Sequence, residues 1–109
     1  MINNPAITIQ INNNNFVAFM KIDYKVLSYF QRGKRRSKVF KSLEQKPRTP
    51  KEIATLCKIS ISNVSNTLAE LMKKGYVKCI NPEAYSYKYF NLTAKGKKSL
   101  KLLTQNNKS

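Results

Sequence analysis

The stretch from Thr49 to Gly75, TPKEIATLCKISISNVSNTLAELMKKG, constrains the fold more than any other part of the chain. Thr49, Pro50 and Glu52 have the spacing of a capping box, in which two side chains satisfy free backbone N–H groups and proline takes the first helical position. Ser60 can cap a second helix, and Gly75 can close it in the left-handed conformation. The stretch therefore predicts two helices joined by a short turn.

Apolar residues inside both predicted helices recur at helical spacing. In the first helix the expected buried face consists of Ile53, Ala54, Leu56 and Cys57. In the second helix it consists of Ile61, Val64, Leu68 and Leu71. Because Ala54 is small, the second helix can cross the first closely. This arrangement predicts a helix-turn-helix motif, with residues 61–74 as its recognition helix.

The flanking segments predict further elements of the same domain. An apolar stripe within residues 34–45 predicts a helix, whereas residues 24–31 fit either a short helix or a β-strand. Residues 76–80 and 87–93 alternate as strands on either side of turn residues, which predicts an antiparallel hairpin with Tyr87 and Tyr89 on its outer face. The segment after the hairpin, TAKGKKSLKLLTQ, predicts a terminal helix capped by its first threonine.

Two parts of the sequence resemble the winged helix-turn-helix regulators, in particular small archaeal relatives of the MarR-like and ArsR-like repressors. IATLCKISISNVSNTLAELMKKGYV is similar to the family's Ala, turn, Val-Ser and Leu-xx-Leu-xxx-Gly pattern, and FNLTAKG is similar to its strand-to-helix junction. The resemblance implies an α+β, mainly α fold with a small hairpin wing, residues 76–92, and a C-terminal helix. It also implies a homodimer formed through terminal segments.

Two residues depart from that family pattern. Lys58 stands where the family usually has a turn glycine, so either its backbone takes a positive φ or the turn differs. Asn66 stands where many relatives carry arginine, so no guanine or phosphate contact is transferred to it from the resemblance.

The remaining segments complete the predicted domain organisation. Residues 1–20 contain ITIQI, four asparagines and FVAFM, which can form a small β-hairpin or a partly disordered leader. We expect this segment to be followed by the winged helix-turn-helix domain over residues 21–104 and by a frayed tail over residues 105–109. A chain of 109 residues with 41% hydrophobic content suits one compact domain.

The charge balance favours a polyanionic partner. Lysine and arginine number 21 against 5 acidic residues, a formal net charge of +16, which attracts nucleic acid. A lysine-rich solvated surface is the plainer alternative. No apolar run approaches the roughly 20 residues that a membrane helix needs, and no secretory signal is recognisable. We therefore expect a soluble, cytoplasmic and nucleoid-associated protein without a membrane partner.

The sequence offers few side chains for catalysis or metal binding. It has no histidine, and Cys57 and Cys79 form no CxxC pair, so no set of four metal ligands can be assembled. Reduced core cysteines are expected rather than a redox pair. The three glycines form no phosphate-binding motif. We predict no enzymatic activity, no cofactor and no metal.

Polar residues of the recognition helix are placed to contact double-stranded DNA if that helix enters the major groove. The residues predicted to contact bases are Ser62, Asn63 and Asn66. An asparagine amide can donate to and accept from adenine at once. The residues predicted to contact the DNA backbone are Arg35, Arg36, Lys51, Ser65, Lys73 and Lys88.

These observations favour a sequence-specific transcriptional regulator that represses by occluding a promoter. One alternative is a non-specific architectural protein that coats DNA through charge. Another is a protein-interaction module in a transcription or viral assembly. The short polar side chains of the recognition helix favour the first function, because a pure backbone binder would present lysine and arginine there.

Overall fold

The computed structural model describes residues 24–108, with side chains as far as Thr104. The hairpin and leader alternatives for residues 1–20 lie outside this range. The chain divides into two compact units, Met1–Arg32 and Gly33–Ser109. The domain limits expected from the sequence stay predictions.

The described part of the first unit is a helix over residues 24–31. The backbone N–H of Arg32 donates to the carbonyl of Ser28 at 3.1 Å and closes its last turn. The helix alternative for this segment is therefore correct and the strand alternative is wrong. Val26, Leu27 and Phe30 have the i, i+1, i+4 spacing of one helical face.

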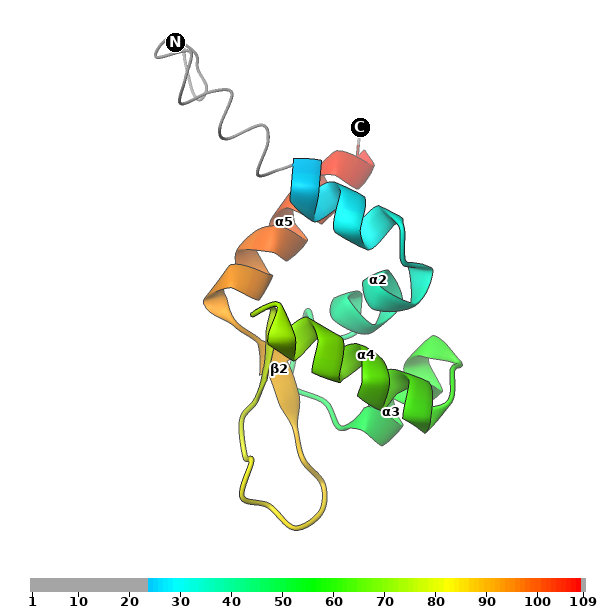
Figure 1. The fold of residues 1–109 in the computed structure, drawn as a ribbon, viewed down its shortest axis with the longest axis vertical. Helices are drawn as coiled ribbons and strands as arrows, with labels where there is room; N and C mark the ends of the chain where they lie inside the picture. Colours follow the sequence, from blue (N-terminus) through cyan, green and yellow to red (C-terminus); the bar gives the residue numbers. More distant parts are fainter. Residues whose placement is uncertain (1–23, 109) are drawn as a thin grey trace, which may run out of the picture. The chain divides into compact units, whose positions relative to one another are not determined.

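The second unit contains four helices and a short hairpin (Figure 1). Its elements are α2 (Lys34–Lys41), α3 (Pro50–Cys57), α4 (Ile61–Lys73), β1 (Val77–Cys79), β2 (Phe90–Leu92) and α5 (Ala94–Lys108). Helices α2, α3 and α4 pack against one another, and α4 also contacts β1. The mainly helical fold with a small hairpin and a C-terminal helix is the one expected from the sequence.

The helix ends follow the local signals in the sequence. Thr49 Oγ1 accepts from the N–H of Glu52 at 3.2 Å, and the N–H of Thr49 donates to Glu52 Oε1 at 2.9 Å, so the predicted capping box is confirmed. Ser60 Oγ accepts from a backbone N–H at 3.1 Å and caps α4. Gly75 has a φ of 85°. Lys58 has a φ of 59° and a ψ of 46°, so it takes the left-handed conformation that the family's glycine would take.

The core of the second unit lies between α2, α3, α4 and the hairpin. Its fully buried side chains include Phe40, Ile53, Val64 and Leu71. The paired residues Val77 and Leu92 of the hairpin are also buried, as expected. Leu100 and Leu103 bury one side of α5. The predicted apolar stripes therefore identify most of this core.

Two residues assigned to the core by spacing are exposed instead. Leu56 is 54% exposed and Ile61 is 50% exposed, so both assignments are wrong. Ile61 shares a side of α4 with Met72, eleven residues later, which is also exposed. Leu56 lies toward the edge of α3, since Ile53 and Ala54 face the core. Helical spacing gives an angle around the axis, but it does not say which angle a neighbouring element covers.

The hairpin is shorter than the alternation of residues predicts. β1 and β2 pair antiparallel over three residues each, and residues 80–89 form a loop. The expected second strand over residues 87–89 is therefore wrong, because Tyr87 has a φ of 57° that interrupts extended backbone. Arg48 adds one bridge beside β2: its N–H donates to the carbonyl of Phe90 at 3.0 Å, and the N–H of Phe90 donates back at 2.9 Å.

The junction into α5 depends on a close backbone approach. Thr93 Oγ1 accepts from the N–H of Gly96 at 3.0 Å and caps α5, as predicted. The same hydroxyl donates to the carbonyl of Gly75 at 2.6 Å. A Cβ at Gly96 would overlap the carbonyl oxygen of Tyr76. Glycine is therefore required where α5 begins.

Candidate nucleic-acid interface

One exposed face of α4 carries the polar side chains that point away from the core. Ser62, Asn66 and Lys73 are exposed and follow one another at helical spacing, with Ala69 between them. The buried residues of α4, among them Leu68, lie on the opposite side. Of the three predicted base contacts, Ser62 and Asn66 therefore occupy the centre of the exposed face.

Asn63 occupies a different edge of α4. It is half-buried and shares its side of the helix with Thr67, which is buried, and with Glu70. Glu70 Oε2 forms an ion pair with Arg36 Nε of α2 at 2.8 Å, with side chains 40% and 30% exposed. An ion pair so exposed contributes about 0–1 kcal/mol. The structure thus gives Arg36 a contact that joins α2 to α4.

A crevice separates α4 from the wing. This cavity of about 280 Å³ is lined by Ser65 and Met72 of α4, by Pro82 and Lys88 of the wing and by Pro50 at the start of α3. We call it the wing crevice. Ser65 and Lys88, which the sequence assigned separately to the DNA backbone, lie on its two walls.

Two further cations predicted to contact DNA lie near helix N-termini. Lys51 is exposed in the first turn of α3, next to Pro50 of the wing crevice. Arg35 is exposed in the first turn of α2. Backbone N–H groups at helix N-termini favour phosphate. Lys51 thus lies beside a wall of the wing crevice, whereas Arg35 belongs to a separate helix.

Asn81 organises the wing loop, residues 80–89. Its Oδ1 accepts from the N–H of Tyr89 at 2.7 Å, and its Nδ2 donates to the carbonyl of Tyr87 at 3.1 Å. The N–H of Ile80 also donates to the carbonyl of Tyr89 at 2.9 Å. An asparagine side chain thus replaces the backbone ladder of a longer hairpin. Sequence reasoning treated Asn81 only as a turn residue; an asparagine before proline at the end of a strand was the available signal.

The wing loop presents aromatic side chains outward. Tyr85 is fully exposed and Tyr87 is 76% exposed. Their hydroxyl groups can bond to sugar or phosphate oxygens. The wing loop, drawn in yellow, extends away from the helices of this unit (Figure 1). The wing loop is therefore accessible to a partner molecule.

The cysteines and acidic residues of the described part of the chain form no cluster that suggests another site. Cys57 and Cys79 are free and half-buried, so neither thiol lies as fully in the core as expected, and their reduced state stays a prediction. Within residues 24–108, no three side chains of the metal-binding types cluster. Nor does this part of the chain contain a helix of the length and apolar character that would cross a membrane.

Comparison with known protein families gives a match over part of the chain. Residues 33–78 match the family described as bacterial regulatory protein, arsR family. The match begins at the first residue of the second unit and ends within β1. No curated protein matches the chain.

Solved structures of similar fold are transcription regulators. A homodimeric winged helix-turn-helix DNA-binding domain from Mycobacterium bovis, a possible ArsR-family regulator, has a TM-score of 0.60 at 20% identity, covering 89% of this chain and 85% of its own. MepR of S. aureus in complex with DNA has a TM-score of 0.63 at 22% identity, covering 84% and 78%. A MarR family regulator from Silicibacter pomeroyi has a TM-score of 0.66 at 21% identity, covering 82% and 60%.

These similarities confirm the predicted fold class and its likeness to ArsR and MarR regulators, while the archaeal origin stays a prediction. The chain is a winged helix-turn-helix protein whose residues 33–78 match the arsR family of bacterial regulatory proteins.

Proposed function

We propose that this protein binds double-stranded DNA through α4 and the wing, and that it represses transcription by occupying a promoter. The observation that carries the proposal is the exposed polar face of α4 beside the wing crevice, with Ser65 and Lys88 on the crevice walls. A net charge of +16 supports a polyanionic partner. The M. bovis neighbour is described as a DNA-binding domain, and MepR was solved with DNA.

In this proposal α4 enters the major groove. Asn66 and Ser62 contact base edges from the centre of the exposed face, and Asn63 contacts them from its edge. The amide of Asn66 can bond to adenine N6 and N7, so A·T-containing sites are expected. The proposed contacts to DNA phosphates come from five cations and one hydroxyl group: Arg35, Arg36, Lys51, Ser65, Lys73 and Lys88.

The proposed assembly is a homodimer formed through the terminal segments. The M. bovis neighbour is described as homodimeric. In this chain α5 is the terminal element of the second unit, with Leu100 and Leu103 buried and Leu102 half-buried. A two-fold dimer would place two recognition helices on successive turns of the duplex. A cytoplasmic, nucleoid-associated location and the absence of catalysis remain part of the proposal.

A second candidate, non-specific coating of DNA, is favoured by the charge alone. Coating would depend on counterion release and would weaken steeply with salt at every sequence. Specific binding retains sequence discrimination as salt rises. The two functions therefore differ in a measurable way.

The test is selection from a randomised duplex library at two salt concentrations with wild type, Asn66→Ala and Gln45→Ala. Gln45 is an exposed amide on the loop between α2 and α3, so Gln45→Ala is the matched control. We expect enrichment of a two-fold symmetric motif, with discrimination at particular base pairs reduced by about 1–3 kcal/mol in Asn66→Ala and unchanged in Gln45→Ala. An unenriched pool whose binding collapses with salt would instead establish coating.

A further inference from the structure

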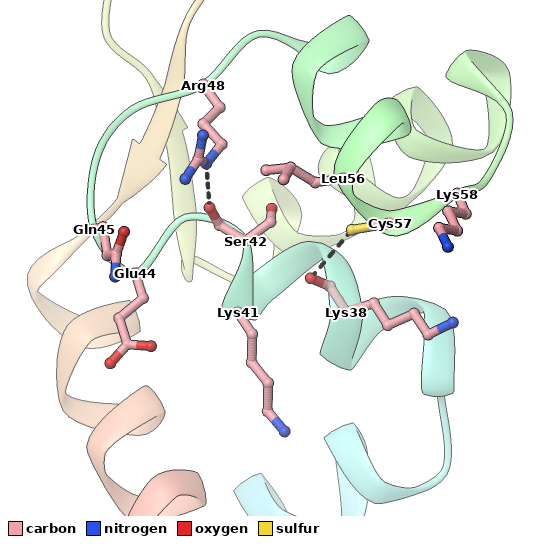
Figure 2. A pocket seen from close by; sticks show the side chains of 9 residues that line it. All are labelled: Lys38, Lys41, Ser42, Glu44, Gln45, Arg48, Leu56, Cys57 and Lys58. Atoms are coloured by element: carbon pink, nitrogen blue, oxygen red, sulfur yellow. Dashed lines mark hydrogen bonds between the residues drawn. The ribbon is translucent and has the colours of Figure 1, made fainter.

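A second cavity lies between α2 and α3, and its lining shares no residue with the wing crevice (Figure 2). Its volume is about 530 Å³, and its walls come from α2, the loop after it, the end of α3 and the following turn. Four cations line it: Lys38, Lys41, Arg48 and Lys58. The single acidic residue of the lining is Glu44, whose carboxylate lies on the side away from Cys57 in Figure 2. The cavity is therefore surrounded mainly by positive charge.

Two of these cations belong to a lysine stripe along α2. Lys34, Lys38 and Lys41 are exposed and follow one another at positions i, i+4 and i+7, which places them on one side of the helix. The buried residues of α2 lie on the other side. The stripe, together with Arg48 and Lys58, forms one surface that we call the cationic face.

The lysine stripe is turned away from α4. Arg36 lies on the opposite side of α2 from the stripe, and it forms the ion pair with Glu70 of α4 at 2.8 Å. DNA is stiff over tens of base pairs, so a duplex that lies on the exposed face of α4 does not wrap around the domain to reach the stripe. The duplex assigned to α4 and the wing therefore gives no reason for the charge of the cationic face.

The charges of the lysine stripe have no counterion in the protein. Within the described residues, no cation of the cationic face forms an ion pair, in contrast to Arg36. Successive lysines of the stripe are separated along the helix axis by about 6 and 4.5 Å, which is shorter than the roughly 8–10 Å over which salt screens exposed charges. These lysines therefore repel one another until an anion binds.

The length of the stripe suits a row of phosphates. From its first to its last lysine the stripe extends about 10 Å along α2. One strand of a DNA duplex carries a phosphate about every 3.4 Å of helix axis. The stripe can therefore neutralise about three successive phosphates of one strand, which a single small anion would not do.

Arg48 adds an oriented donor group to the cationic face. Its Nε donates to the carbonyl of Ser42 at 2.6 Å (Figure 2). This bond uses one of the five N–H donors of the guanidinium and restricts the orientation of its plane. The remaining donors can bind a phosphate at two points. Leu56, which is 54% exposed and extends toward Arg48 (Figure 2), offers an apolar contact for the sugar between two phosphates.

We propose that the cationic face binds the phosphate backbone of a second DNA duplex, so that one protein molecule joins two duplex segments. The first segment lies on α4 and the wing, and the second lies along α2. Binding of a duplex at the cationic face stands independently of the proposed function, whereas the joining of two duplexes rests on it. Because phosphates carry no sequence information, the second duplex is bound without regard to its sequence.

The test measures how tightly the whole protein, already bound to an immobilised duplex, captures a second, fluorescent duplex. The test variant combines Lys38→Gln with Lys41→Gln. The matched control combines Lys98→Gln with Lys101→Gln, which also replaces two exposed lysines three positions apart on a helix. We expect wild type and control to capture the second duplex alike. The test variant should capture it at least about tenfold more weakly, with a log–log salt dependence that is smaller by about 2.

Two results of the capture experiment would overturn the proposal. Equal capture by the test variant and the control would mean that the two duplexes are joined without the cationic face, for example by a dimer that holds one duplex on each α4. No capture by wild type would mean that the cationic face is an ordinary solvated surface.

An NMR titration of the whole protein separates this inference from the proposed function. With excess duplex of about one helical turn, roughly 10 base pairs, we expect the amide resonances of both Lys38 and Asn66 to shift. Shifts at Asn66 alone would keep the proposed function and overturn the second site. Shifts at Lys38 alone would establish the cationic face as a DNA site and refute both the proposed function and the joining of two duplexes.

Discussion

Replacing Asn81 by alanine should loosen the wing while leaving the helical core folded. The substitution removes the side-chain bonds to the Tyr89 N–H at 2.7 Å and to the Tyr87 carbonyl at 3.1 Å. Each such bond contributes about 0.5–1.5 kcal/mol net. Because Tyr87 and Tyr89 are exposed, water can replace both partners, and we expect a total loss toward the low end, about 1–2 kcal/mol.

This loss should be local, because within residues 24–108 the Asn81 side chain bonds only to other residues of the wing, namely Cys79, Tyr87 and Tyr89. Val77 and Leu92, which anchor the hairpin to the core, keep their pairing and burial. The wing loop should therefore open more often without global unfolding. With about 1.4 kcal/mol corresponding to a factor of ten, amide exchange at Tyr89 and Ile80 should accelerate roughly 5–30-fold.

Hydrogen exchange followed by NMR measures this effect residue by residue, and urea unfolding measures global stability. The matched control is Ser86→Ala, an exposed residue of the same loop. It should leave exchange at Tyr89 unchanged. If Asn81→Ala exchanges like wild type, the side-chain bonds do not hold the wing; if it lowers global stability by the full amount, the wing does not open independently of the core.

Two other substitutions and one alkylation measurement test separate parts of the structure. Gly96→Ala should lower the free energy of unfolding by about 1–3 kcal/mol or more in urea titration, because its Cβ overlaps the Tyr76 carbonyl; unchanged stability would contradict that contact. Lys58→Gly should raise the free energy of unfolding by up to about 1 kcal/mol, because the left-handed backbone is strained for lysine and not for glycine. Destabilisation would refute the assigned strain. The raised pKa of Cys57 favours its neutral thiol in the folded protein. The contribution of this thiol to folding stability should therefore be complete below the pKa of the unfolded thiol, and it should be lost as pH rises through the pKa of the folded thiol. Its alkylation by iodoacetamide at pH 8 should be slower than in urea-unfolded protein, and equal rates would contradict the shift.

The ends of the helices were predictable from sequence because they depend on neighbours in the chain. Thr49 and Glu52 satisfy backbone groups three residues apart, and Thr93 does the same for Gly96. The geometry of each cap is complete within one turn of helix. At Lys58 the sequence left two alternatives, and the observed φ of 59° selects the left-handed one.

The candidate interface was predictable only in part. The positions of Ser62 and Asn66 on α4 follow from helical spacing alone. The half-burial of Asn63 was missed, because it depends on where α2 packs against α4. Likewise, Ser65 and Lys88 are far apart in the sequence, and only the packed hairpin brings them to one crevice.

The helices of the second unit, their caps, the turn between α3 and α4 and most of the apolar core could be predicted from the amino-acid sequence, because these features depend on local hydrogen bonds and on helical period. The tertiary packing alone shows that Leu56 and Ile61 are exposed, that Asn81 closes the wing loop and that the backbone of Arg48 pairs with Phe90 of β2. Each of these depends on which surface another element covers or on a side chain that competes with the backbone ladder. Neither can be determined from the spacing of residues along one segment.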